Sequence, residues 1–484
     1  MKLGLIAGIL RASVPAGAEG IDITDLAYDS RKVTEDSLFF CVPGALVDGH
    51  HFAEQAVGAG AAALVSSHSV QAAVPEIIVD DPRRAMGVVS DAFFGQPSRE
   101  LSLVGVTGTN GKTTTVYMLD SIFRATGEAS GLISNIERRI GPKVLPAPRL
   151  NAPEAIDLQR LLRMMLDAGV TKCAMEVTSE GIAQGRTDAT EFEVAVFTNL
   201  TQDHLNFHHT MENYYLAKRF LFTDLARAAV VSIDDKWGRR LASEVGIPVT
   251  TFGTSDAADL RAVDMELGPA GSSFRAVGLD LDIQVQIKIP GVFNVMNALG
   301  AAAAANTLGI SPADITAGLE SLAGVPGRFE RVDAGQPFTV LIDYAHTPDA
   351  LIAVLAAARS LGSGRVLAVF GCGGDRDASK RPLMGEAAGR GADLVFATSD
   401  NPRSEDPLQI LREIEKGLTE WPPPLGYEII PDRAEAIRRA VAEAGDGDIV
   451  VIAGKGHETG QEFAEGKIDF DDRLIAADAL RNVR

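Results

Sequence analysis

Cysteine is scarce in this sequence, and its placement argues against both a disulfide framework and a cysteine metal site. The 484 residues include three cysteines, Cys41, Cys173 and Cys372, which are far apart and include no Cys-x-x-Cys pair. Long apolar runs are also missing, because no stretch approaches the ~18 residues of a membrane-spanning helix. We therefore expect a cytoplasmic protein with reduced thiols.

Positive charge is the second deficit. Lys and Arg total 45 against 65 Asp and Glu, which gives a formal net charge of −20. The basic residues form no stripe, so we expect neither nucleic acid nor a membrane as a partner. The apolar N-terminus is interrupted by Arg11 and predicts an amphipathic start to a folded domain rather than a signal peptide. We find no internal repeat and expect a monomer.

The chain length predicts about three domains. Residues 1–98 predict a small α/β domain, with strands at 21–26, 37–42, 62–65 and 76–79 and a helix at 52–60. Residues 99–327 alternate apolar strands with helices, the pattern of a doubly wound, mostly parallel sheet. Its strands are expected at 101–106, 172–177, 194–198 and 229–233, with helices beginning near Lys112, Ala155, Met211 and Asn294.

A second α/β unit is expected over residues 328–484, after a hinge at 324–327. Strands are predicted at 339–342, 366–370, 394–397 and 449–453, with helices from Asp349, Met384, Pro407 and Arg433. The fold class is therefore α/β: a small N-terminal domain, a central domain with a parallel sheet and a C-terminal domain of Rossmann-like alternation. The alanine-rich stretch 298–306 predicts a packed helix.

The stretch 101–115 is the strongest functional signal. An apolar strand is followed by Thr107-Gly-Thr-Asn-Gly-Lys-Thr-Thr114, and the glycines at 105, 108 and 111 let backbone N–H groups turn toward one point. Lys112 can then reach the β- and γ-phosphates of a nucleotide, and the Thr113 hydroxyl can bind Mg²⁺. The alternative is a glycine-rich turn without a nucleotide, which the intact Gly-Lys-Thr after a strand disfavours.

Polar residues follow several other strands, where the active sites of such sheets gather. Glu176 ends one strand among apolar neighbours and is either an Mg²⁺ ligand or a hydrogen-bonded structural carboxylate. His204 is either a metal ligand or a structural histidine, and Lys218 would by itself be assigned to solvent. Four further polar segments, at 343–346, 371–377, 399–403 and 454–458, predict a polar pocket facing the phosphate loop.

Together these motifs resemble the Mur ligases, the ATP-dependent amide-forming enzymes of peptidoglycan assembly, along nearly the whole chain. The resemblance rests on the phosphate loop, Glu176, residues 199–204, Asn294 with Asn297, Arg328, and Asp343 to His346. Asp29-Ser-Arg31, Gly371-Cys-Gly-Gly-Asp-Arg-Asp377, Asp400-Asn-Pro-Arg403 and Gly454-Lys-Gly-His-Glu458 are similar to the diamino-acid-adding members. The resemblance implies an ATP- and Mg²⁺-dependent ligase that joins meso-2,6-diaminopimelate to UDP-N-acetylmuramoyl-L-alanyl-D-glutamate through an acyl phosphate.

The resemblance also implies a role for each matching residue. ATP would be bound by Gly108, Thr109, Asn110, Gly111, Lys112, Thr113, Thr114, Asn297, Arg328 and Asp343. The metal ligands would be Thr113, Glu176, His204 and Lys218, with Lys218 carbamylated to N6-carboxylysine, and the catalytic residues would be Lys112, Glu176, His204 and Lys218. The UDP-sugar peptide would be bound by Ser30, Asn151, Ala152, Thr178, Gln184 and Arg186, and the diaminopimelate by Arg376, Asp400, Asn401, Arg403, Gly454 and Glu458.

Selectivity for diaminopimelate is expected to depend on Arg403, because its guanidinium can form two parallel hydrogen bonds with the carboxylate that lysine lacks. The alternative is that Arg403 makes a structural salt bridge, for example to Glu405 or Asp406. Three alternative functions remain at this point. They are a lysine-adding Mur ligase, a folylpolyglutamate-type ligase, and a catalytically weak regulator that binds the nucleotide-sugar peptide.

Overall fold

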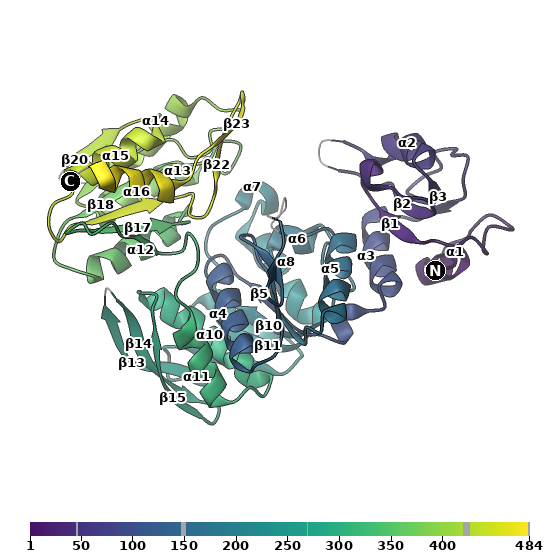
Figure 1. The fold of residues 1–484 in the computed structure, drawn as a ribbon, viewed down its shortest axis with the longest axis horizontal. Helices are drawn as coiled ribbons and strands as arrows, with labels where there is room; N and C mark the ends of the chain where they lie inside the picture. The colour runs from purple at the N-terminus through teal and green to yellow at the C-terminus, as the bar shows by residue number, and fades with distance from the viewer. Residues whose placement is uncertain (45–46, 147–151, 269, 420–425, 483–484) are drawn as a thin grey trace. The chain divides into compact units, whose positions relative to one another are not determined.

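The structure is a computed structural model that describes residues 1–44, 47–146, 152–268, 270–419 and 426–482 (Figure 1). The chain forms two compact units. The first contains Met1–Gly105, Glu128–Ala195 and Ala217–Ala228, and the second contains Val106–Gly127, Val196–Leu216 and Ala229–Arg484. Within the described stretches, no helix is long and apolar enough to cross a membrane.

The first unit begins with a sheet of parallel strands in the order β1-β2-β3-β4. The strands are β1 (Asp25–Ala27), β2 (Ser37–Phe40), β3 (Ala61–Ser66) and β4 (Glu76–Ile78), and the helices around them are α1 (Leu3–Leu10), α2 (Ala53–Gly58) and α3 (Pro82–Phe93). Short 3-10 turns lie at Ser30–Lys32, Gly49–Phe52 and Pro97–Arg99. The last three predicted strands and the helix of residues 1–98 are confirmed, whereas the strand predicted at 21–26 overlaps β1 only at Asp25 and Leu26.

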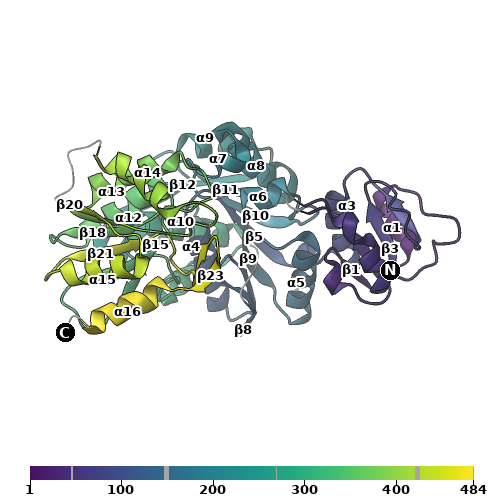
Figure 2. The same cartoon turned by 90° about the horizontal axis from the view of Figure 1, so that it is seen from above.

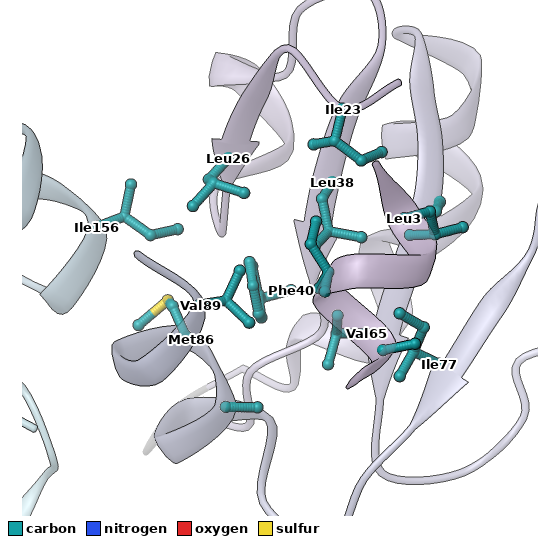
Figure 3. Close-up of a cluster of buried hydrophobic side chains, with 14 of the residues drawn as sticks. Leu3, Ile23, Leu26, Leu38, Phe40, Val65, Ile77, Met86, Val89 and Ile156 are labelled. Carbon is teal, nitrogen blue, oxygen red and sulfur yellow. The ribbon is translucent and has the colours of Figure 1, made fainter. Parts of the chain in front are cut away.

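The core of this part of the unit extends to α5 (Ala155–Asp167). Alternate residues of a strand point to one face, so Leu38 and Phe40 of β2 face α3 together. Ile156 of α5 packs into the same cluster beside Met86 and Val89 (Figure 3). A hydrogen bond also connects this part of the chain to α5, because the Tyr28 hydroxyl donates to the Asp157 carboxylate at 2.7 Å.

A larger sheet has eleven strands in the order β15-β14-β13-β12-β11-β10-β5-β9-β6-β7-β8. Its strands are β5 (Ser102–Thr107), β6 (Ser130–Ile133), β7 (Arg138–Ile140), β8 (Lys143–Val144), β9 (Lys172–Glu176), β10 (Phe192–Phe197), β11 (Ala226–Ser232), β12 (Val249–Gly253), β13 (Leu260–Gly268), β14 (Gly271–Gly278) and β15 (Leu281–Ile287). The pairs β6–β9, β11–β12 and β12–β13 are parallel, whereas β7, β8, β14 and β15 add antiparallel edges that the sequence analysis did not predict.

Besides α5, the helices that connect these strands are α4 (Lys112–Ala125), α6 (Ser179–Ala183), α7 (Leu205–His208), α8 (Met211–Phe220), α9 (Lys236–Glu244), α10 (Val292–Thr307) and α11 (Pro312–Ser321), with a π-helical turn at Leu221–Leu225. Helices α4, α5, α8 and α10 begin at or near the predicted residues. In the second unit α4 packs closely on α11, since a Cβ on Gly318 would lie 2.3 Å from Ile122 Cα. The predicted alanine-rich helix is α10, and its alanines are buried.

The C-terminal part of the second unit is a six-stranded sheet in the order β16-β17-β21-β18-β19-β20. Its strands are β16 (Glu330–Val332), β17 (Thr339–Asp343), β18 (Val366–Phe370), β19 (Leu394–Ala397), β20 (Gly426–Ile429) and β21 (Ile449–Ala453). Helices α15 (Arg433–Glu443) and α16 (Asp472–Asn482) lie on one face, and α12 (Pro348–Ser360), α13 (Lys380–Gly391) and α14 (Pro407–Thr419) lie on the other (Figure 2). A hairpin of β22 (Gly460–Phe463) and β23 (Gly466–Asp469) follows β21.

Strands β17, β21, β18 and β19 are parallel, so their carboxyl ends lie at one edge of the sheet. The four polar segments predicted from the sequence follow these strand ends. Backbone bonds join neighbouring segments, from Gly454 N to the Asp343 oxygen at 3.1 Å and from Gly374 N to the Asn401 oxygen at 2.9 Å. The fold therefore brings all four segments to one edge.

Candidate active site

The predicted phosphate loop connects β5 to α4. Gly108 has a φ of +148° and Gly111 a φ of +88°, conformations that residues with a side chain rarely adopt. A Cβ on Gly108 would lie 1.9 Å from Thr198 Oγ1, and a Cβ on Gly111 would lie 2.2 Å from Asn297 Oδ1. Lys112 opens α4, and its ammonium donates to two loop carbonyl oxygens at 2.8 and 3.0 Å. The N-terminus of α4 and an ammonium thus lie at one place, which fits a phosphate.

Gly105 does not belong to the loop, contrary to the sequence-based expectation. It lies inside β5, where a Cβ would approach the Phe192 ring at 2.7 Å and Val177 Cγ2 at 3.2 Å. Glycine at this position allows close packing within the first unit. The sharp turning of the loop is due to Gly108 and Gly111.

Asn199 and Tyr214 hold the loop in shape. The Asn199 carbonyl oxygen accepts from Thr109 N at 2.9 Å, and its side chain exchanges two bonds with the Asn110 backbone, at 3.0 and 3.1 Å. The Thr109 hydroxyl lies 3.2 Å from the Tyr214 hydroxyl. Because the N–H groups of Thr109 and Asn110 are already bonded to Asn199, we infer that these two residues contribute mainly the shape of the loop.

Asn297 lies beside Gly111 of the loop, Arg328 contacts the first turn of α4, and Asp343 lies near Arg328. Arg328 Nη2 donates to Thr113 Oγ1 at 2.9 Å, and its guanidinium lies 4.4 Å from the centre of the Tyr344 ring. The buried Asp343 carboxylate accepts from two backbone N–H groups, at 2.7 and 2.8 Å. Burial raises the pKa of Asp343, and the charge of Arg328 opposes this effect. Thr114 is buried in the first turn of α4.

His204 has a left-handed backbone conformation, with a φ of 54°, directly before α7. Its Nε2 lies 3.3 Å from Asp203 Oδ2, and His346 Nε2 lies 3.6 Å from the same oxygen. Burial raises the pKa of Asp203, but the bond to His346 and the nearby charges outweigh it, so the pKa lies well below its ordinary value. Asp203 is therefore an ionised carboxylate between two imidazoles, and it was not among the residues predicted from the sequence, although the neighbouring His204 was.

Two of the candidate metal ligands, Glu176 and Lys218, belong to the first unit. Glu176 ends β9 and is 2% exposed, and its Oε1 accepts from Asn135 N at 3.1 Å. Lys218 lies in the last turn of α8 and is 1% exposed, so it is not the solvated lysine that periodicity alone would suggest. In the described part of the chain, no three His, Cys, Asp or Glu side chains gather into a metal site.

The residues expected to bind the UDP-sugar peptide also belong to the first unit, except that Asn151 lies outside the described residues. Ser30 Oγ donates to Gln55 Oε1 at 2.9 Å. Thr178 caps α6 by accepting from Gly181 N at 3.1 Å, and Gln184 follows the end of that helix. Arg186 donates to the Ala152 carbonyl oxygen at 3.2 Å.

Glu154 organises this region. Its carboxylate lies 3.2 Å from Arg186 Nε and accepts from Arg83 Nη1 at 2.7 Å. Because Arg83 is in α3 and Glu154 directly precedes α5, this ion pair joins α3 to the segment that carries Ala152. The sequence offered no signal for it, since the partners are 71 positions apart.

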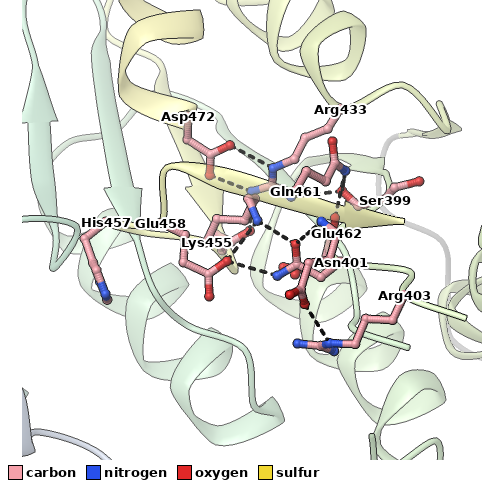
Figure 4. A network of polar contacts seen from close by, with 12 residues as sticks. Ser399, Asn401, Arg403, Arg433, Lys455, His457, Glu458, Gln461, Glu462 and Asp472 are labelled. Carbon is pink, nitrogen blue, oxygen red and sulfur yellow. Dashed lines mark hydrogen bonds and ion pairs between the residues drawn. The ribbon is translucent and has the colours of Figure 1, made fainter. Parts of the chain in front are cut away.

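Four of the six residues expected to bind diaminopimelate lie together in the C-terminal part of the second unit: Asp400, Asn401 and Gly454 are buried, and Glu458 is partly buried. Asn401 Nδ2 donates to Glu458 Oε2 at 2.9 Å (Figure 4). Gly454 has a φ of +117°, and a Cβ there would lie 2.5 Å from Asp400 Oδ2. Arg376, by contrast, is exposed, and its Nη1 donates to the neighbouring carbonyl oxygen at 3.2 Å.

Arg403, the sixth residue of that set, contacts a different carboxylate from those considered in the sequence analysis. Its Nε donates to Glu462 Oε2 at 3.1 Å and its Nη1 to the Gly374 carbonyl oxygen at 2.7 Å. Glu405 instead accepts from Arg381 at 2.8 Å. The guanidinium has five N–H donors, so these contacts orient it and leave N–H groups for a carboxylate.

Comparison with known proteins identifies the family of this chain. Residues 22–104 match the catalytic domain of the Mur ligase family, 106–305 the Mur ligase middle domain and 327–456 the Mur ligase glutamate ligase domain. The chain is 47% identical over 471 residues to the UDP-N-acetylmuramoyl-L-alanyl-D-glutamate--2,6-diaminopimelate ligase of Geobacillus thermodenitrificans strain NG80-2, with 96% of each chain covered. The chain belongs to the Mur ligase family. The ligase of the same name from Bacillus licheniformis is 44% identical over 494 residues and covers 100% of both chains.

Solved structures agree with membership of the Mur ligase family. A structure of a ligase with the same name is 33% identical, with a TM-score of 0.71 and coverage of 100% of this chain and 99% of that one. MurF from Acinetobacter baumannii is 19% identical with a TM-score of 0.71, and covers 98% of each chain. Mycobacterium tuberculosis folylpolyglutamate synthase is 18% identical with a TM-score of 0.65, covering 83% of this chain and 95% of that one. The last two show a shared fold alone, and the predicted fold class is confirmed.

Proposed function

We propose that this Mur ligase uses ATP to join meso-2,6-diaminopimelate to UDP-N-acetylmuramoyl-L-alanyl-D-glutamate, in the cytoplasm and as a monomer. The observation that carries the proposal is the 47% identity, across 96% of each chain, to a ligase of that name. A folylpolyglutamate-type activity has weaker support, because that relative is 18% identical. We assign residues 1–98 to the UDP end of the acceptor, 99–327 to ATP and 328–484 to the incoming amino acid.

The proposed ATP site is built from the phosphate loop, Asn297, Arg328 and Asp343. Lys112 neutralises charge on the transferred phosphate, a task that fixed donors perform without covalent chemistry. Arg328, held by Thr113 and by the Tyr344 ring, adds a second positive charge beside the loop. Asn297 is oriented by Asn294, whose Oδ1 accepts from Asn297 Nδ2 at 3.2 Å.

Three of the four proposed metal ligands, Thr113, Glu176 and a carbamylated Lys218, would supply oxygen atoms, which Mg²⁺ prefers. Thr113 is 3% exposed and Glu176 is 2% exposed, so both residues are held in fixed surroundings. With His204 and a carbamylated Lys218, they would hold the metal, which would supply positive charge to the phosphate oxygens. Depletion of CO₂ should lower the activity, and bicarbonate should restore it. Full activity without CO₂ would contradict carbamylation.

In the proposed reaction the D-glutamate side-chain carboxylate attacks the γ-phosphorus of ATP, so that an acyl phosphate forms and ADP leaves. The amine of diaminopimelate then attacks the acyl carbon, the C–O bond to phosphate breaks, and the amine releases a proton as the amide forms. The acceptor is held by Ser30, Asn151, Ala152, Thr178, Gln184 and Arg186 in this proposal. Exclusion of water protects the acyl phosphate until the amine arrives.

Recognition of diaminopimelate is assigned to Asn401, Arg403 and Glu458, with Asp400, Gly454 and Arg376 around them. Diaminopimelate differs from lysine by a distal carboxylate, which the oriented guanidinium of Arg403 can bind through two N–H groups. A site built around such a bond rejects analogues that lack it by ~10⁴. A lysine-adding enzyme would have no use for this arrangement.

A ligation assay with the UDP-muramoyl dipeptide, ATP and a panel of diamino acids tests the proposal. The wild type should use meso-diaminopimelate and almost no lysine. Arg403→Ala should lose most of its kcat/KM for diaminopimelate, so its preference for diaminopimelate over lysine should be smaller than that of the wild type. Arg412→Ala is a matched control, because Arg412 is an exposed residue of α14. Preference of the wild type for lysine, or full preference retained by Arg403→Ala, would overturn the assignment.

A further inference from the structure

Lys455 is a buried lysine in the loop that follows β21. Its side chain is 0% exposed, and its Nζ donates to Asn401 Oδ1 at 3.0 Å and to Glu458 Oε2 at 2.9 Å (Figure 4). A buried ammonium is costly unless it is paired and hydrogen-bonded. Both of its partners are residues to which we assign recognition of the diamino acid, so Lys455 acts on that site without being exposed to a ligand.

The contacts of Lys455 determine which way the Asn401 amide points. Asn401 Oδ1 accepts from Lys455 and also from Glu462 N at 3.0 Å, while Asn401 Nδ2 donates to Glu458 Oε2 at 2.9 Å. A flipped amide would place its NH₂ group against an ammonium and a backbone N–H, so three bonds would be lost. The amide therefore has one orientation, and it has a second N–H on Nδ2 that this network does not use.

The same bonds set the Glu458 carboxylate. Lys455 and Asn401 both bond to Oε2, so Oε1 is the oxygen that the network leaves for a ligand. Lys455 also keeps a positive charge beside this carboxylate in a region that contains the buried Asp400 and Asp472. The carboxylate is thereby held in a fixed position.

The β22–β23 hairpin holds the third recognition group. Arg403 N donates to the Glu462 carbonyl oxygen at 3.0 Å, and Arg403 Nε bonds to the Glu462 side chain. Gln461 Nε2 donates to the Asp400 carbonyl oxygen at 2.7 Å. The Asn401–Arg403 turn is thus tied to the hairpin, and three groups are left to face a ligand. They are a carboxylate oxygen, an amide N–H and a guanidinium, which together complement the ammonium and carboxylate of an amino acid.

We propose that Lys455 is the positioning residue of this subsite, which sets Asn401 and Glu458 to receive one amino-acid end of the diamino acid. This proposal rests on the proposed function, since it takes diaminopimelate as the substrate. Lys455 does not touch the substrate, and its effect passes through the two side chains that it holds. It should therefore act on the binding of diaminopimelate and leave the binding of ATP and of the acceptor unchanged.

Lys455→Met tests the proposal, because it keeps the length of the side chain and removes the ammonium. The KM for diaminopimelate should rise on the order of 30-fold, as expected for loss of charged hydrogen bonds in a buried site. The KM values for ATP and for the UDP-muramoyl dipeptide should stay within about twofold of the wild type. Lys416→Met, on the exposed face of α14, is the matched control and should leave all three KM values unchanged.

A second variant keeps the test decisive if Lys455→Met does not fold. Lys455→Gln retains an N–H donor without the charge, and it should show a smaller rise that is again confined to diaminopimelate. Equal changes in all three KM values, or no change for diaminopimelate in a folded variant, would overturn the positioning role. Failure of the proposed function is distinguishable, because the wild type itself would then not ligate diaminopimelate.

Discussion

Lys112 is the first residue of α4, and its ammonium donates to two carbonyl oxygens of the phosphate loop. Lys112→Ala should leave the protein folded, since alanine suits a helix start and Gly108 and Gly111 still shape the loop. Ligation should fall about 10²-fold or more, because the transferred phosphate loses a fixed positive charge. Steady-state rates combined with circular dichroism check this outcome. Near-normal turnover by a folded variant would contradict the phosphate-loop assignment.

His457 carries a prediction about pH. Burial, with the charges of Arg328 and Arg473, lowers the His457 pKa from 6.5 to about 3. The folded protein therefore binds fewer protons here than the unfolded chain below pH 6.5, and stability is complete above that pH and falls toward pH 3. The loss approaches about 1.4 kcal/mol per pH unit from this group.

Comparison with His457→Gln isolates this effect. The wild type should lose more Tm between pH 7 and pH 5 than the variant does, because Gln takes up no proton. Differential scanning calorimetry at pH 7 and at pH 5 measures the change in Tm of each protein. Parallel losses in the two proteins would mean that His457 is protonated alike in the folded and unfolded states.

At the scale of elements, Arg433 and Asp472 join two helices. Arg433 begins α15, Asp472 begins α16, and both side chains are 0% exposed with Arg433 Nη2 2.7 Å from Asp472 Oδ2. A cation at a helix N-terminus is unfavourable, so the Asp472 carboxylate offsets both that charge and the burial. Arg433 Nη2 also donates to the Ala453 carbonyl oxygen at 3.0 Å, at the end of β21.

Replacing only one partner of this ion pair should destabilise the protein more than replacing both partners. Arg433→Met leaves Asp472 buried without its partner, which costs about 3–5 kcal/mol, whereas Arg433→Met with Asp472→Leu should recover most of that loss. Thermal unfolding should show a Tm drop of roughly 5–10 °C for the single variant. A double variant that is less stable than the single one would contradict this account.

The elements differ in how far the sequence predicted them. Strands β18, β19 and β21 begin and end at the predicted residues, because each is a buried apolar run bounded by polar residues or glycine. Helix α13 begins at Lys380 rather than Met384, since Pro382 lies in its first turn, where no N–H donor is needed. Strands β13, β14 and β15 were missed because they are antiparallel partners of one another, and register of that kind depends on tertiary pairing.

The residues of the candidate site also differ in how far the sequence predicted them. Local motifs predicted the phosphate loop, the strand-end position of Glu176 and the segments at 399–403 and 454–458. The supports of these residues were not predictable, because Lys455 lies 54 positions from Asn401 and Arg433 lies 39 positions from Asp472. Only the fold brings such partners together, and no local spacing encodes them.

At the scale of the whole molecule, the proposed chemistry needs three substrates. The phosphate loop, Arg328 and the proposed diaminopimelate site belong to the second unit, whereas Glu176, Lys218 and the described acceptor-binding residues belong to the first. The chain has a net charge of −20, and ATP and the acceptor are anions. We therefore expect binding of these substrates to depend on local positive groups, for which Lys112, Arg328 and Arg186 are the proposed residues, rather than on long-range attraction.

Coupling between the three substrates separates a ligase from a nucleotide-sugar-binding regulator. Phosphate leaves only when the amine attacks the acyl phosphate, so sustained phosphate release should require ATP, the UDP-muramoyl dipeptide and meso-diaminopimelate together. Omission of either of the last two should lower the steady rate by about 10²-fold or more, because water is kept from the acyl phosphate. A continuous phosphate assay measures these rates, with Lys112→Ala as the inactive control. Phosphate release at the same rate without the acceptor and the amino acid would indicate an uncoupled ATPase. No phosphate release in the presence of all three substrates would indicate a binding protein.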